Sequence, residues 1–112
     1  MCIPGPSYPS SLTVSTPSQD INKYVRDCLG VYQRKTGLSQ YGRPVWGKIG
    51  GSYTRYLYYT SYGYWTIGTD YKSGGGWITS EQSGLASVPE TGWKVLWLGD
   101  WRSDPGMTVV AL

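Results

Sequence analysis

The residues best suited to chemistry in this chain are aromatic rings that also carry a polar group. The chain has eleven Tyr and six Trp but no Phe and no His. Seven rings, with no carboxylate among them, lie within thirteen residues: Tyr53, Tyr56, Tyr58, Tyr59, Tyr62, Tyr64 and Trp65. Because Tyr and Trp suit surfaces that are partly apolar and partly wet, this pattern indicates contact with a ligand or a partner.

Catalysis has little support in the other residues. Without His, neither a Ser-His-Asp nor a Cys-His nucleophile can form, and no His-ligated metal site is possible. Cleavage of a glycosidic bond would need two carboxylates about 5–10 Å apart. The seven carboxylates fall mostly in predicted turns or on a predicted helix: Asp20, Asp27, Asp70, Glu81, Glu90, Asp100 and Asp104. We therefore expect a protein that is not an enzyme and needs no cofactor or metal.

Length and charge narrow the class of protein further. A chain of 112 residues can bury one modest core, which favours a single domain. The net charge of +3 is small and the ten Lys and Arg are scattered, so nucleic acid is not the expected partner. No apolar stretch approaches the roughly 20 residues of a membrane span. The first residues lack a signal-peptide pattern, and a secreted and a cytosolic location both stay open.

The N-terminal part is predicted to differ from the rest. Residues 1–15 are rich in Pro, Gly and Ser, which is typical of an extended arm, and residues 16–112 form the single β domain. Cys2 and Cys28 could form a disulfide between the arm and the domain. The alternative, which we favour, is one buried thiol and one thiol in a disordered segment.

A short amphipathic helix is predicted at about residues 17–28. Thr16 can cap it, Pro17 suits its first position, and Gly30 can end it. One apolar stripe then recurs at helical spacing: Ile21, Tyr24, Val25 and Cys28.

After Gly30 the pattern changes to short strands separated by turn residues. We expect seven, at 31–34, 43–49, 55–60, 64–69, 77–79, 93–98 and 107–111. Their spacing favours an all-β fold, as an antiparallel meander, a small sandwich or a barrel.

Alternation along two of these strands divides the rings between two faces. The predicted core set is Leu57, Tyr59, Trp65 and Ile67. The predicted exposed set on the opposite face is Tyr56, Tyr58 and Tyr64. The aromatic-rich stretch is thus reduced to a face of three tyrosines on one hairpin.

Several short segments carry a resemblance to known proteins. They are Gly30-Val31-Tyr32, Gly42-Arg43-Pro44-Val45-Trp46, Tyr56-Leu57-Tyr58-Tyr59, Trp65-Thr66-Ile67-Gly68, Gly92-Trp93 and Asp104-Pro105. Together they resemble a small aromatic-rich all-β module that recurs in marine-invertebrate and protist proteins. The resemblance covers about residues 30–110, and it implies a portable β domain with nothing catalytic.

The leading hypothesis is a non-catalytic binding module whose exposed rings stack on a ligand, for which a carbohydrate is expected. The candidate ligand-binding residues are Tyr56, Tyr58, Tyr64, Trp46, Arg43 and Arg55.

Two rival hypotheses remain. One is a structural or assembly subunit, in which the aromatic face and the N-terminal arm dock on a larger protein complex or on a second copy of the chain, since interface cores are also rich in Tyr, Trp and Arg. The other is binding of single-stranded nucleic acid by stacking, which ranks third.

Overall fold

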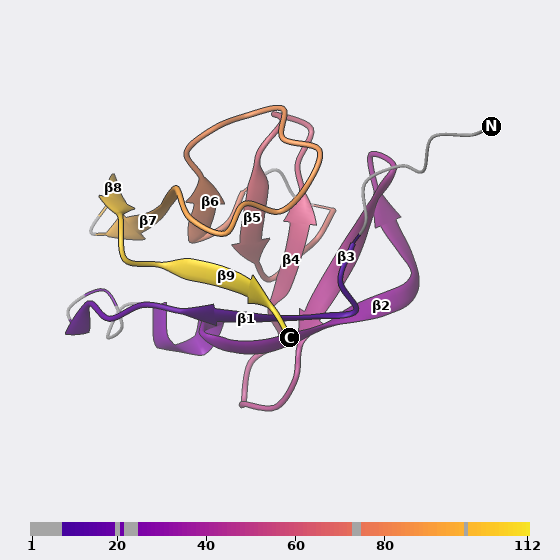
Figure 1. Cartoon of the computed structure of the whole chain (residues 1–112), viewed down its shortest axis with the longest axis horizontal. Coiled ribbons are helices and arrows are strands. Elements are labelled where there is room, and N and C mark those ends of the chain that lie inside the picture. Colours follow the sequence, from indigo (N-terminus) through magenta and orange to yellow (C-terminus); the bar gives the residue numbers. More distant parts are fainter. Residues whose placement is uncertain (1–7, 20, 22–24, 73–74, 98) are drawn as a thin grey trace.

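The structure, a computed structural model, describes residues 8–19, 21, 25–72, 75–97 and 99–112 (Figure 1). Within these residues nine strands form one antiparallel sheet in the order β8-β7-β6-β5-β4-β3-β2-β1-β9. The strands are β1 (Ser11–Ser15), β2 (Gly30–Gln40), β3 (Arg43–Lys48), β4 (Tyr56–Tyr59), β5 (Trp65–Gly68), β6 (Ile78–Ser80), β7 (Trp93–Trp97), β8 (Asp100–Asp104) and β9 (Thr108–Ala111). The predicted all-β antiparallel class is confirmed.

The predicted number of strands is wrong, because two strands were missed. One is β8, which follows β7 as its hairpin partner. The other is β1, which occupies residues 11–15 of the predicted extended arm and pairs with both β2 and β9. Leu12 and Val14 of β1 are buried, so this segment belongs to the core. The Pro-rich residues before it hid the alternation that marks it as a strand; residues 1–7 of the predicted arm lie outside the described residues.

The predicted amphipathic helix at about 17–28 is also not borne out. Among the described residues of this segment, Gln19, Ile21 and Val25 are helical, and Arg26–Cys28 form one turn of 3-10 helix with no side-chain cap at its start. Residues 20 and 22–24 lie outside the described part. Ile21, Val25 and Cys28 are buried, so the described residues of the predicted apolar stripe belong to the core. Cys28 is a free thiol, and Cys2 lies outside the described residues.

The sheet curls strongly. Figure 1 shows β1 and β9 crossing the lower part of the view, with β4, β5 and β6 standing nearly upright above them. A register shift in β2 between Arg34 and Ser39 interrupts its pairing with β3, and such irregularities bend a strand and increase its twist. The curl gives the sheet a concave side, and the core fills it.

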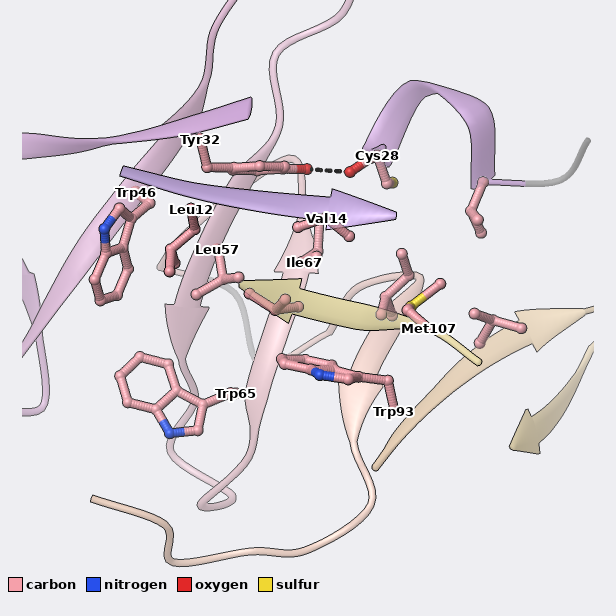
Figure 2. Close-up of a cluster of buried hydrophobic side chains, with 14 of the residues drawn as sticks. Leu12, Val14, Cys28, Tyr32, Trp46, Leu57, Trp65, Ile67, Trp93 and Met107 are labelled. Carbon is pink, nitrogen blue, oxygen red and sulfur yellow. Dashed lines mark hydrogen bonds between the residues drawn. The ribbon is translucent and has the colours of Figure 1, made fainter. Parts of the chain in front are cut away.

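Large rings dominate that core, and their polar atoms are satisfied by main-chain carbonyls. Figure 2 shows Trp46, Trp65 and Trp93 around aliphatic side chains from β1, β4 and β5. The indole N–H groups of these three residues donate to the carbonyls of Pro9 (2.9 Å), Leu85 (3.0 Å) and Pro89 (3.0 Å), respectively. The Tyr32 hydroxyl donates to the Cys28 carbonyl at 2.7 Å. The rings therefore fasten connecting segments to the inner face of the sheet.

The two edge strands of the sheet are consecutive in the chain. β8 ends at Asp104 and β9 begins at Thr108, so a short turn returns the chain from one edge of the curled sheet to the other. The buried Asp104 carboxylate accepts the hydroxyl proton of Thr16 (2.5 Å) and the N–H of Gly106 (3.2 Å). Its main-chain carbonyl accepts the N–H of Met107 (3.1 Å). Asp104 thus links the turn to the end of β1.

Replacing Asp104 with Ala should lower the free energy of unfolding by about 2–4 kcal/mol, because two donors lose a charged acceptor inside the protein. Asp100→Ala, on the exposed part of the same strand, is the matched control and should change stability by less than about 0.5 kcal/mol. Urea denaturation followed by Trp fluorescence measures both. Equal stability of the two variants would contradict the conclusion that Asp104 holds the turn after β8 to the end of β1.

Candidate functional site

Two of the predicted ligand-binding residues are fully buried, which corrects the sequence-based assignment. Trp46 has no exposed surface and lies in the core, where its N–H is bonded to Pro9. Tyr58 also has no exposed surface. Neither ring can stack on a ligand in this conformation.

Tyr58 is buried for a reason that alternation cannot reveal. It does lie on the face opposite Leu57 and Tyr59, but the connection between β5 and β6 crosses over it. The Tyr58 hydroxyl donates to the carbonyl of Gly75 at 2.5 Å. Gly68, beside it, leaves room for the ring, since a Cβ there would lie 2.6 Å from the Tyr58 hydroxyl oxygen. The predicted core residues on the other face are all buried: Leu57, Tyr59, Trp65 and Ile67.

The other predicted residues are half-buried and do not form one site. Tyr56 packs edge-on against Tyr71, with ring centroids 5.2 Å apart. The Arg43 guanidinium stacks 3.8 Å from the centroid of the Tyr59 ring. Arg55 lies over Trp77 at 4.6 Å and 3.9 Å from the Asp27 carboxylate. Arg55 and Tyr56 line one hollow of about 380 Å³, and Tyr64 lines a separate one.

This hollow, which we call the outer hollow, has a volume of about 280 Å³ and spans strands β4 to β8 on the convex face. Cross-strand pairing explains its position, because Tyr58, Thr66, Thr79, Lys94 and Ser103 form one row across the sheet. Gly75 and Gly76, from the connection between β5 and β6, form one wall of the outer hollow. The lining residues are Thr60, Tyr62, Tyr64, Thr66, Gly75, Gly76, Thr79, Lys94 and Trp101.

Aromatic rings flank Lys94, which is the only charged side chain among the described residues that line the outer hollow. Trp101 is 44% exposed and Tyr62 is 74% exposed, whereas Tyr64 is half-buried. The Lys94 ammonium lies 5.7 Å from the ring centroids of both Tyr64 and Trp101. The hollow therefore offers flat apolar faces next to a cation.

Hydroxyl groups form the floor of the outer hollow. The Thr79 hydroxyl donates to the main-chain carbonyl of Trp65 at 3.2 Å. Because a hydroxyl has one proton, the 3.1 Å bond between the Thr66 and Thr79 oxygens must be donated by Thr66. Both floor oxygens thus have their protons committed and retain lone pairs. The floor presents acceptors, and Lys94 supplies donors.

Sequence reasoning missed most of the outer hollow. Lys94, Thr66 and Thr79 fall in predicted strands and Trp101 in none of them, and no ligand-binding role was predicted for any of the four. One signal was available: Lys94 is the single charge in an otherwise apolar strand, between the buried Trp93 and Val95. Alternation places such a charge on the solvent side, which marks the outer face of β7.

No protein-family model, curated protein or solved structure matches the chain. The resemblance to the marine-invertebrate and protist module therefore stays an expectation. The part of the chain that the structure describes contains no helix with the length and apolar character of a membrane span. The same residues contain no group of three or more His, Cys, Asp or Glu side chains placed to hold a metal ion.

Burial, with a further contribution from the nearby Asp70 carboxylate, raises the pKa of Tyr58 to about 12. In an alkaline absorbance titration of the folded chain, Tyr58 should therefore ionise after the exposed tyrosines, whose ordinary value is about 10. Since the folded-state pKa is the higher one, the stability that neutral Tyr58 contributes is intact below about pH 10. It should be lost between about pH 10 and pH 12.

Tyr58→Phe provides the comparison for this titration. It should remove one late-ionising group and, at neutral pH, about 1 kcal/mol of stability through the lost bond to Gly75. The stability difference from wild type should then shrink above about pH 10. Tyr62→Phe, at an exposed position, should leave the late titration unchanged. Ionisation of Tyr58 together with the exposed tyrosines would refute its burial beneath the loop.

Proposed function

We propose that the chain is a non-catalytic binding module that takes a sugar ring into the outer hollow. The observation that carries the proposal is the exposed Trp101 ring, which stands with Tyr62 and Tyr64 at a hollow whose floor is made of hydroxyl groups. This keeps the expected ligand class and replaces the expected residues.

The composition of the outer hollow suits a sugar better than a purely apolar ligand. The C–H face of a sugar ring packs on flat aromatic surfaces, and Trp and Tyr provide such surfaces with little conformational entropy to lose. Sugar hydroxyls can donate to the oxygens of Thr66 and Thr79 and accept from Lys94. At about 280 Å³ the hollow is smaller than most sites for drug-sized ligands, which favours one or two sugar units.

The same residues support binding without cleavage. Hydrolysis of a glycosidic bond needs a pair of carboxylic groups flanking that bond. The described residues that line the outer hollow include no Asp and no Glu. A sugar held there would have no general acid beside it.

Trp101→Ala should weaken binding of a glycan selected on an array by roughly 10- to 30-fold, because a central aromatic anchor typically contributes about 1.4–2 kcal/mol or more. Titration calorimetry with that glycan measures the change. Trp77→Ala is the matched control: Trp77 is 37% exposed but does not line the outer hollow, and its loss should leave affinity within about twofold.

Two results would overturn the proposed function. One is the absence of binding to any glycan on the array by the wild-type chain. The other is an equal loss of affinity in the Trp101 and Trp77 variants. Tyr58→Ala is unsuitable as a test, because removing a buried ring would destabilise the fold as well as any site.

Assembly is the second candidate function, and the position of β8 favours it. β8 forms one edge of the sheet in the described residues and presents the exposed Trp101. Edge strands can add a strand from another chain, and self-association there would cover part of the outer hollow.

Light scattering after size-exclusion chromatography separates the two candidates. A sugar-binding module that works alone should elute as a 12.4 kDa monomer at all concentrations tested. An assembly through β8 should appear as a concentration-dependent dimer that Trp101→Ala weakens.

A further inference from the structure

Among the described residues Lys94 has no acidic partner, although it lines a partly enclosed hollow. Its ammonium group carries three N–H donors. Within the described residues no ion pair of 4.0 Å or less joins Lys94 to a carboxylate, whereas Arg55 and Asp27 do form such a pair. The other residues that line the outer hollow are uncharged.

The carboxylate on the neighbouring strand is already engaged. Glu81 directly follows β6, and by alternation it falls on the same face of the sheet as Thr79 and Lys94. It accepts a hydrogen bond from the hydroxyl of Ser103, the residue paired with Lys94 across β7 and β8. The hydrogen bond holds this carboxylate on β8, and Lys94 is left facing the outer hollow.

The contacts of Lys94 with the Tyr64 and Trp101 rings leave its ammonium group able to bind an anion. At 5.7 Å from each centroid, the ammonium lies near the outer limit of about 6 Å for a cation–π contact. Such a contact satisfies the charge only partly and leaves N–H groups available. Tyr64 and Trp101 therefore position the cation between them.

We propose that the sugar taken into the outer hollow is acidic and that its anionic group, a carboxylate or a sulfate ester, pairs with Lys94. The inference rests on the proposed function and deepens it by naming the class of sugar. A charged oxygen acceptor forms a shorter and stronger hydrogen bond with an ammonium group than a neutral hydroxyl does. The ring of the same sugar packs on Trp101, while its hydroxyls meet Thr66 and Thr79.

Three matched disaccharides test the inference: one of glucose units, one with a glucuronic acid unit and one with a 6-sulfated glucose unit. At low salt the wild-type chain should bind at least one acidic form roughly tenfold more tightly than the neutral form. This preference should fall as salt is raised. The comparison between the carboxylated and the sulfated form identifies the anion.

Lys94→Gln should bring the affinity for the acidic sugar down to that for the neutral sugar. The neutral sugar should lose less affinity than the acidic one, because the Gln amide can still donate to a hydroxyl but carries no charge. Lys72→Gln removes the same charge at an exposed residue that does not line the hollow, and it should keep the preference. Unchanged urea midpoints would show that both variants fold.

The outcomes separate the two proposals. Equal binding of neutral and acidic sugars by the wild-type chain would overturn the inference and keep the proposed function. An equal loss of both sugars in Lys94→Gln would also overturn the inference, since Lys94 would then serve any sugar. If none of the three sugars binds while Trp101→Ala still weakens a glycan found on the array, only the inference fails.

Discussion

The fold depends on one requirement: the N–H and O–H groups of its buried Trp and Tyr rings must find hydrogen-bond acceptors. Three core indoles and one core phenol donate to the main-chain carbonyls of Pro9, Leu85, Pro89 and Cys28. A buried polar group without a partner costs about 1–3 kcal/mol, so each ring fixes the segment that satisfies it. Phe, which the chain lacks, would fill the same space and hold no segment.

These contacts explain how a small curled sheet keeps long connections in place. The segment between β6 and β7 is held by Trp65 and Trp93, and its residue Glu90 accepts the N–H of Val109 from β9. Asp104 then joins the turn after β8 to the end of β1. With the concave side closed in this way, the convex face of β4 to β8 is available to form the outer hollow.

Alternation in the sequence was sufficient for part of the core but not for the surface. It assigned Leu57, Tyr59, Trp65 and Ile67 to the interior, because every second residue of a strand faces the same side. It failed for Tyr58, which faces outward and is still covered by a loop. Such cover depends on where Gly75 lies against Tyr58, and a pattern within one strand carries no information on that.

By itself the sequence determined the antiparallel all-β class, most strand positions and the absence of His chemistry, because these follow from local periodicity and residue type. Only the tertiary structure decided that residues 11–15 are a strand inside the sheet and that Arg26–Cys28 form a turn of 3-10 helix. It also decided that Lys94, Trp101 and Tyr64 line the same hollow. Those outcomes depend on pairing between strands distant in the chain, where long-range contacts override local preference.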